Sequence, residues 1–334
     1  MSGARPAHAH VESPLQLLCA VEAHAAGLTG TATVVHARRD VPALRAARAE
    51  LAALGLPAGL DLDGPPGPVR LPRAGTWVVG DAFSGSFQSR LAAGGGPARL
   101  VLVDDGLATL ALADVLLAAD RPVQRVGSSH HRLRRALGLR TARRLRALAA
   151  DGRLTLFTAM PLGEDAARLA DSGITVVRDD LGWLRSRPAA APVPEATVVL
   201  GSGLVADGLV DPDAYVAWVG RVVAEGPVRY LPHRRHDRAV TRRVAALGAT
   251  VEAPGAPAEI RLRSLGEGQR VLMLPSTALV LLGSTLAGSG ADVVGVPVPA
   301  GWWTRDASPA LRAHLSSVLD LAARPGTGRA GGAR

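Results

Sequence analysis

The sequence predicts an α/β protein built from two Rossmann-like domains that face each other across a cleft. Two observations lead to this prediction. Apolar, β-prone runs alternate with helical patterns along the chain, and a Pro- and Ala-rich stretch interrupts the alternation near its middle. The chain has 334 residues, more than a typical single domain, and its hydrophobic content of 48% is enough for a core in each half.

The first half, residues 1–185, forms the predicted N-terminal Rossmann-like domain. Its first helix is predicted at 15–27, with Ser13 as N-cap and Pro14 at the first helical position. A second helix, at 41–55, ends at Gly55, a residue type that commonly terminates helices. Strands are predicted at 31–37, 75–81, 99–106 and 152–159, and further helices at 86–94, 107–119 and 140–150.

Residues 186–196, with the sequence SRPAAAPVPEA, are the predicted linker, because the stretch is rich in Pro and Ala and the pattern restarts after it. Residues 197–325 form the predicted C-terminal domain, and the tail at 326–334 is predicted to be disordered. In this half, strands are predicted at 196–202, 228–233, 249–254, 271–276 and 291–298, and helices at 213–226, 238–248 and 277–288.

The chain is strongly basic, with a net charge of +9, and all 38 basic residues are arginine. Arginines are concentrated at 130–148 and 233–243, where the simplest interpretation is a solvated helix face. Neither run contains the aromatic residues that stack on bases, so we do not expect a nucleic-acid partner. Attraction to an acidic glycan or an anionic membrane surface stays open.

Cys19 is the only cysteine, which excludes an internal disulfide and a cysteine-based zinc site. The N-terminus lacks the apolar core of a signal peptide, and no apolar stretch is long enough to span a bilayer. We therefore expect a cytoplasmic protein, with peripheral contact at the inner face of the cell membrane left open.

An acidic pair follows the apolar run RLVLV: Asp104, Asp105 and then Gly106, which permits a sharp turn. In open α/β sheets, ligands bind at the carboxyl edge of the strands, where this pair is predicted to lie. One carboxylate could act as a general base while the other caps the following helix. Cap and catalysis are equally consistent with the motif alone.

Two further polar clusters follow strand-like runs in the second half. His233 comes after VRYLP and is followed by Arg234 and Arg235, a combination suited to binding and protonating a phosphate. Ser276 and Thr277 follow VLMLP and open a helix, whose amino end offers N–H groups to an anion. Three strand-end clusters of this composition indicate an active site for an anionic substrate.

In their order along the chain, these clusters resemble the motifs of the bacterial sialyltransferase and polysialyltransferase group, whose members have the GT-B fold. That group carries an acidic pair before glycine, a histidine motif usually written His-Pro, and a Ser-Ser/Thr motif. The stretches at 12–23, 78–91 and 198–219 are similar too, and residues 256–259 resemble a glutamate-bearing segment of the group.

The resemblance implies an inverting, metal-independent transfer of a nonulosonic (sialic-type) acid from a CMP-sugar to a hydroxyl acceptor, with no cofactor. Asp104 or Asp105, with a slight preference for Asp104, would be the general base, and His233 would protonate or hydrogen-bond the departing phosphate. The implied donor-binding residues are Ser276, Thr277, Glu259, Arg234, Gly201, Ser202, Ser13 and Pro14.

The chain departs from the group where Arg234 replaces the proline of the His-Pro pair. Two alternatives therefore remain: a sugar-nucleotide enzyme of the same fold, such as a 2-epimerase-like enzyme, and a non-catalytic protein that binds acidic glycans. The Asp61/Asp63 and Asp211/Asp213 pairs have the spacing of metal-binding DxD motifs, but turn and helix-cap roles explain them better. The acceptor, the linkage and the oligomeric state cannot be predicted from the sequence.

Overall fold

The computed structural model describes residues 5–67, 71–94, 96–125, 132–253 and 255–323. The chain divides into two compact units, and each is described by itself. The first unit comprises Met1–Ala190 and Gly255–Arg263, and the second comprises Ala191–Pro254 and Ser264–Arg334. The first boundary lies within residues 186–196, where the linker was predicted, whereas the predicted tail at 326–334 lies outside the described residues.

The first unit is built on a parallel sheet with strand order β3-β2-β1-β4-β5-β6-β7. The strands are β1 (Ala7–Val11), β2 (Thr33–Ala37), β3 (Leu60–Gly64), β4 (Thr76–Val79), β5 (Arg99–Val103), β6 (Leu154–Thr158) and β7 (Thr175–Arg178). Strand order reverses between β1 and β4, which is the switch point at which doubly wound sheets bind ligands.

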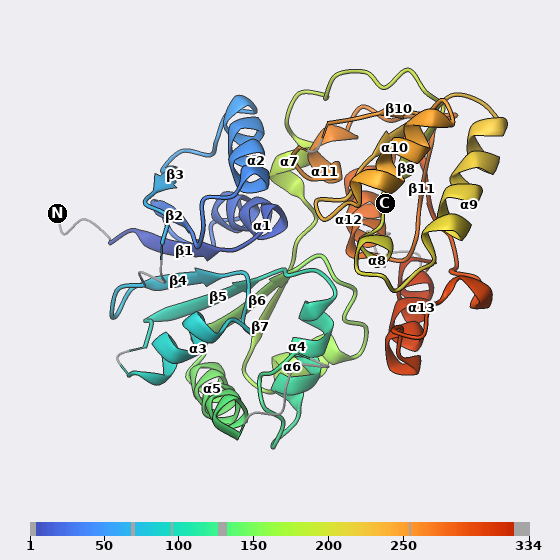
Figure 1. Cartoon of the computed structure of the whole chain (residues 1–334). Helices are drawn as coiled ribbons and strands as arrows, with labels where there is room; N and C mark the ends of the chain where they lie inside the picture. Colours follow the sequence, from blue (N-terminus) through green and yellow to red (C-terminus); the bar gives the residue numbers. More distant parts are fainter. Residues whose placement is uncertain (1–4, 68–70, 95, 126–131, 254, 324–334) are drawn as a thin grey trace, which may run out of the picture. The chain divides into compact units, whose positions relative to one another are not determined.

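Helices cover both faces of this sheet (Figure 1). The helices of the first unit are α1 (Pro14–Ala25), α2 (Pro42–Ala53), α3 (Gly85–Ala92), α4 (Ala108–Leu117), α5 (Arg132–Ala150), α6 (Asp165–Asp171) and α7 (Gly182–Arg185). The short helix α11 (Ala258–Arg261) also belongs to this unit. Alternate residues of β4, β5 and β6, among them Trp77, Leu102 and Leu156, form a buried core with α3, α4 and α5. The central strands β4 and β5 are apolar on both faces because both of their faces are covered.

The second unit has a smaller parallel sheet with strand order β10-β9-β8-β11-β12. Its strands are β8 (Thr197–Leu200), β9 (Val228–Leu231), β10 (Thr250–Val251), β11 (Arg270–Met273) and β12 (Asp292–Gly295). Its helices are α8 (Gly203–Ala206), α9 (Pro212–Ala224), α10 (Arg238–Ala246), α12 (Thr277–Thr285), the 3₁₀ turn η1 (Ala300–Trp302) and α13 (Pro309–Ala323). Side chains of α9 and α10 pack with β8, β9 and β11 in one core.

The predicted fold class, two Rossmann-like α/β domains, is confirmed by the two parallel sheets and their strand orders. Several predicted helix starts are also confirmed. The Ser13 hydroxyl accepts a hydrogen bond from the backbone N–H of Gln16, and Pro14 is the first residue of α1. Asp211 caps α9 in the same way, so its carboxylate has the structural role expected for that DxD spacing.

Three strands of the first sheet, β1, β3 and β7, lie outside the ranges predicted from the sequence. The predicted strand at 249–254 is shorter, at Thr250–Val251, and the predicted helix at 140–150 begins earlier, at Arg132. Within the described part of the chain, no helix is long and apolar enough to cross a membrane.

Candidate functional site

The switch point of the first sheet gathers polar side chains at the carboxyl ends of three strands. The segment after β1 leads through Ser13 into α1, the segment after β4 carries Asp81, and β5 ends directly before Asp104 and Asp105. Because β1, β4 and β5 are neighbours and parallel, these segments lie at one edge of the sheet.

Asp104 is fully buried and its carboxylate is occupied. One oxygen accepts from the Thr158 hydroxyl at 2.5 Å and the other from the Ala159 backbone N–H at 2.6 Å. The Thr109 hydroxyl accepts from the backbone N–H of the next residue, Asp105, at 3.2 Å. Burial raises the pKa of Asp104 to about 6 despite the hydrogen bonds to its carboxylate. The residue joins the ends of β5 and β6, and an acceptor hydroxyl cannot reach it in this arrangement.

Asp105 is the carboxylate that remains partly exposed, with 19% of its side chain accessible. One oxygen accepts from the Gln16 side-chain amide at 2.7 Å, and the other is paired with the Arg125 guanidinium. Arg125 also contacts Asp81 at 3.1 Å, so it bridges two carboxylates. Burial and the charge of Asp81 raise the pKa of Asp105, and Arg125 partly opposes this shift. The geometry therefore favours Asp105 over Asp104 as the group that meets a substrate.

Gln16 reaches Asp105 because Gly80 has no side chain. A Cβ at Gly80 would lie 2.3 Å from the Cγ of Gln16, far inside van der Waals contact. The same glutamine accepts from the backbone N–H of Glu12 at 2.7 Å, which fixes its amide orientation. Gln16, Asp81 and Arg125 were not among the residues predicted from the sequence. Glycine directly after a strand and before an aspartate was the available signal for Asp81.

Ser13 and Pro14 were predicted to help bind the donor. The Ser13 hydroxyl is engaged as the cap of α1, and Pro14 is buried. Both lie at the carboxyl edge of the first sheet, and a role in binding stays a prediction.

In the second unit, His233 follows β9 and is half-buried. Its Nδ1 accepts from the backbone N–H of Arg235 at 3.2 Å, so in the neutral ring Nε2 carries the proton. Burial, together with the charges of Arg235 and Arg234, lowers the pKa of His233 to about 4. Near neutral pH this histidine is therefore an uncharged hydrogen-bond donor, and protonation of a leaving group by an imidazolium is not favoured before an anion binds.

Two glycines let the loop after β8 pack against His233. A Cβ at Gly201 would lie 2.7 Å from the His233 backbone nitrogen and 2.8 Å from the Tyr230 hydroxyl. A Cβ at Gly203 would lie 2.8 Å from Cε1 of the His233 ring. Ser202 between them caps α8 by accepting from the Leu204 N–H at 3.1 Å. The structure thus brings the predicted Gly201 and Ser202 against His233, and it adds Gly203.

Ser276 and Thr277 lie after β11, the neighbour of β8 at the switch point of the second sheet. Ser276 is extended and precedes α12, but its hydroxyl makes no capping bond and instead lies 3.8 Å from the Met273 sulfur. The serine therefore occupies the predicted N-cap position without the expected side-chain cap. An anion could receive N–H groups from this helix end.

The arginines after His233 have different surroundings. Arg235 forms an ion pair with Asp207 at 2.8 Å, which holds its guanidinium toward the loop after α8. Arg234 is exposed. The loop after β9 is cationic at its tip, as expected of a segment that meets a phosphate.

Glu259 was predicted to bind the donor as part of the C-terminal domain. The structure assigns its segment, Gly255–Arg263, to the first unit and leaves its side chain only 5% exposed. Burial raises the pKa of Glu259 to about 7. It is thus not brought together with Ser276 and Thr277 inside one unit, and its role stays a prediction.

Among the described residues, no group of three or more His, Cys, Asp or Glu side chains is placed to hold a metal ion. Asp61 and Asp63 lie on β3, at the edge of the first sheet, and Asp63 is within 3.4 Å of Arg48. The expectations of metal independence and of no cofactor stay predictions.

No protein-family model matches the chain, and no curated protein does. Among solved structures, it is similar to a UDP-glucose:anthocyanidin 3-O-glucosyltransferase in complex with UDP, with 11% identity, coverage of 95% of this chain and 94% of that chain, and a TM-score of 0.44. A Medicago truncatula protein complexed with UDP-glucose is 9% identical, with coverage of 95% of this chain and 93% of that chain and a TM-score of 0.40. A Thermobaculum terrenum O-GlcNAc transferase mutant is 14% identical, with coverage of 97% of this chain and 61% of that chain and a TM-score of 0.32. With TM-scores below 0.5, these likenesses carry no assignment of donor or reaction.

Proposed function

We propose that this chain is a glycosyltransferase that moves a nonulosonic acid from a CMP-sugar to a hydroxyl acceptor, with inversion and without a metal. The observation that carries the proposal is that polar clusters lie at the carboxyl edge of both parallel sheets, at or beside the two switch points. One edge is acidic, with Asp105, and the other carries His233, Ser276 and Thr277. The sequence resemblance to bacterial sialyltransferases supports the identity of the donor.

Asp105 is the general base in this proposal. The acceptor oxygen attacks the anomeric carbon while its proton passes to the Asp105 carboxylate, whose orientation Gln16 and Arg125 fix. Burial that raises the pKa of Asp105 makes it a stronger base than a solvated aspartate, provided that it stays ionised. Asp104 holds the end of β5 in place through Thr158 and Ala159.

The second unit accepts the leaving group. As the bond between the anomeric carbon and the phosphate oxygen breaks, negative charge develops on CMP. His233 donates a hydrogen bond from Nε2 to that phosphate, and the amino end of α12 with Ser276 and Thr277 supplies further donors. Arg234 adds positive charge, and Gly201 and Ser202 shape the loop beside the histidine.

The test is CMP release from CMP-sialic acid by the purified full chain, with hydroxyl acceptors of several classes and with UDP-glucose as the alternative donor. Asp105→Asn should lower transfer by a factor on the order of 100 or more, because the base is lost while the shape is kept. Asp114→Asn, which neutralises an exposed carboxylate of α4, is the matched control and should keep full activity. Turnover of UDP-glucose but not of CMP-sialic acid would refute the CMP-sugar as donor. If neither sugar nucleotide is turned over or bound, the proposed glycosyltransferase activity is refuted.

A further inference from the structure

Helix α5 presents an unusual surface on the first unit. It contains no acidic residue, and five of its arginines are exposed: Arg132, Arg135, Arg140, Arg143 and Arg144. Among the described residues, none of these five forms an ion pair. The exposed arginines run from Arg132 to Arg144 of this helix, so the basic face is about 18 Å long at the usual rise per residue.

The other two arginines of α5 have structural roles and do not belong to this face. Arg134 donates to the Gln88 side chain at 2.7 Å and to the Phe83 carbonyl. Arg146 donates to the carbonyls of Ala118 and Ala119 at 2.7 and 2.8 Å, at the end of α4. These two arginines thus have partners inside the fold, whereas the five exposed ones have no ion-pair partner in the part of the chain that the structure describes.

Leu133 lies at the start of the same face and is 84% exposed, more than Leu247 or Val294, the other exposed large apolar side chains of the described residues. Positions 133, 140 and 144 are spaced by seven and four residues and so lie on one side of the helix. An exposed leucine next to unpaired arginines suits a surface that is anionic outside and apolar underneath.

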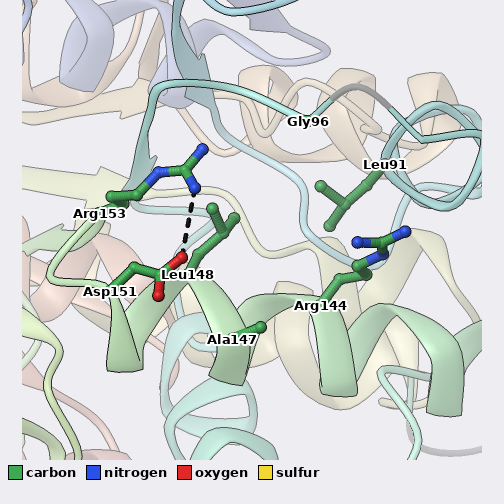
Figure 2. A pocket seen from close by; sticks show the side chains of 7 residues that line it. All are labelled: Leu91, Gly96, Arg144, Ala147, Leu148, Asp151 and Arg153. Carbon is green, nitrogen blue, oxygen red and sulfur yellow. Dashed lines mark hydrogen bonds and ion pairs between the residues drawn. The ribbon is translucent and has the colours of Figure 1, made fainter.

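A cavity of about 120 Å³ adjoins the C-terminal half of this face. It is lined by Leu91 and Leu148 and by polar groups that include Arg144 and Arg153, and Figure 2 shows these two arginines on opposite sides of it. Arg153 is held by Asp151 at 3.3 Å and by the Ala98 carbonyl at 2.8 Å, whereas Arg144 has no such partner in the described part of the chain. Arg144 therefore presents a guanidinium at the edge of this cavity that can pair with a phosphate, while the Asp151 carboxylate of the same lining is paired with Arg153.

We propose that the exposed face of α5, from Leu133 to Arg144, docks on a membrane surface rich in anionic phospholipid. We choose an anionic lipid surface as the partner because of charge complementarity. Five exposed guanidinium groups lie on one helix that has no carboxylate between them, and each can pair with a lipid phosphate. The helix has no aromatic side chain to stack on bases, which disfavours a nucleic acid. The proposal does not depend on the catalytic one and can fail separately.

The test is co-sedimentation of the full chain with vesicles of phosphatidylcholine that contain about one third phosphatidylglycerol, against phosphatidylcholine alone. Binding should require the anionic lipid and should weaken between about 0.1 and 0.5 M salt. Each arginine increases the affinity for an anionic membrane roughly fivefold, so R140Q/R143Q/R144Q should bind these vesicles about 100-fold more weakly than the wild type. The control R221Q/R242Q/R305Q removes the same charge from exposed sites of the second unit and should bind like the wild type.

Insertion of Leu133 can be tested separately because Cys19, the only cysteine, is buried. Leu133→Cys labelled with a polarity-sensitive dye should shift to the blue on anionic vesicles, and the labelled control Leu247→Cys should not. Equal binding by the two triple variants would overturn the proposal. So would a failure to bind anionic vesicles while an RNA oligonucleotide or an acidic polysaccharide binds in a manner that depends on α5.

Discussion

Gly203→Ala is a substitution whose effect can be worked out from the distances around His233. The new Cβ would lie 2.8 Å from Cε1 and 3.2 Å from Nδ1 of the imidazole. Ordinary contact begins near 3.4 Å, so the ring has to move by about 0.6 Å. Gly203 is the first residue of α8 and has no positive φ, so alanine is compatible with the backbone there. The variant should therefore fold, with its imidazole displaced.

A displacement of this size should cost transfer activity because the Nε2 proton no longer points at the leaving phosphate oxygen. We expect kcat to fall by roughly 10- to 100-fold, with little change in the thermal unfolding temperature. Gly283→Ala in α12 is the matched control, since its Cβ would meet nothing within 4 Å and alanine favours a helix. If Gly203→Ala kept kcat within twofold of wild type, the position of the His233 ring would not matter to the reaction.

Three further predictions concern charge. Arg125→Gln should raise the pKa of Asp105 further, because the opposing guanidinium is lost. The acid limb of the plot of kcat/KM against pH should then move to higher pH. If this limb does not move, Asp105 is not the base that titrates there. Burial, with the charges of neighbouring carboxylates, raises the pKa of Asp179 to about 8, so the native state holds this proton more firmly than the unfolded chain does. That contribution to stability is complete in acid and is lost as the pH rises through about 8. Asp179→Asn should therefore narrow the difference in free energy of unfolding between pH 5 and 9 by up to about 4 kcal/mol, whereas Asp171→Asn, at an exposed position of α6, should leave that difference unchanged. In NMR titrations, the pKa of His233 should be found near 4 and should rise when CMP is added, because a bound phosphate stabilises the imidazolium. A value near 6.5 in the free protein would contradict the lowering of this pKa by burial and by the charges of Arg235 and Arg234.

The strands that the sequence predicted are those with continuous apolar runs, such as β5 and β9, because both of their faces are buried. The central strand β1, AHAHV, was missed because its histidines interrupt the apolar pattern. His8 is hydrogen-bonded to His36 of the neighbouring strand at 3.0 Å, and His10 is only 2% exposed. The pairing of β1 with β2 and β4 therefore forms a strand here, although the alanines and histidines of β1 give only a weak sequence signal for one.

The same limit applies to β3. Its sequence, LDLDG, was interpreted as a turn because of the Gly and Pro that follow, but Leu60 and Leu62 are buried while Asp61 and Asp63 are exposed. That alternation is the pattern of a strand with one open face. At the candidate site, sequence order brought out Asp105, His233 and Ser276, whereas Gln16 and Arg125 could not be found because they reach Asp105 from other segments, 89 and 20 residues away.

The two switch points carry opposite electrostatic characters, and this difference gives each a separate task in the proposed reaction. At the first, Arg125 is paired with both Asp81 and Asp105, and burial raises the pKa of Asp105, which prepares it to take up a proton. At the second, burial and the charges of Arg235 and Arg234 lower the pKa of His233, so the ring is neutral before an anion binds. Binding of a phosphate there would offset the arginine charges and raise the pKa of the histidine, so the ring could become an acid only in the complex. Proton uptake and charge stabilisation would then both depend on the substrate being bound, and this coupling is what the CMP titration of His233 measures.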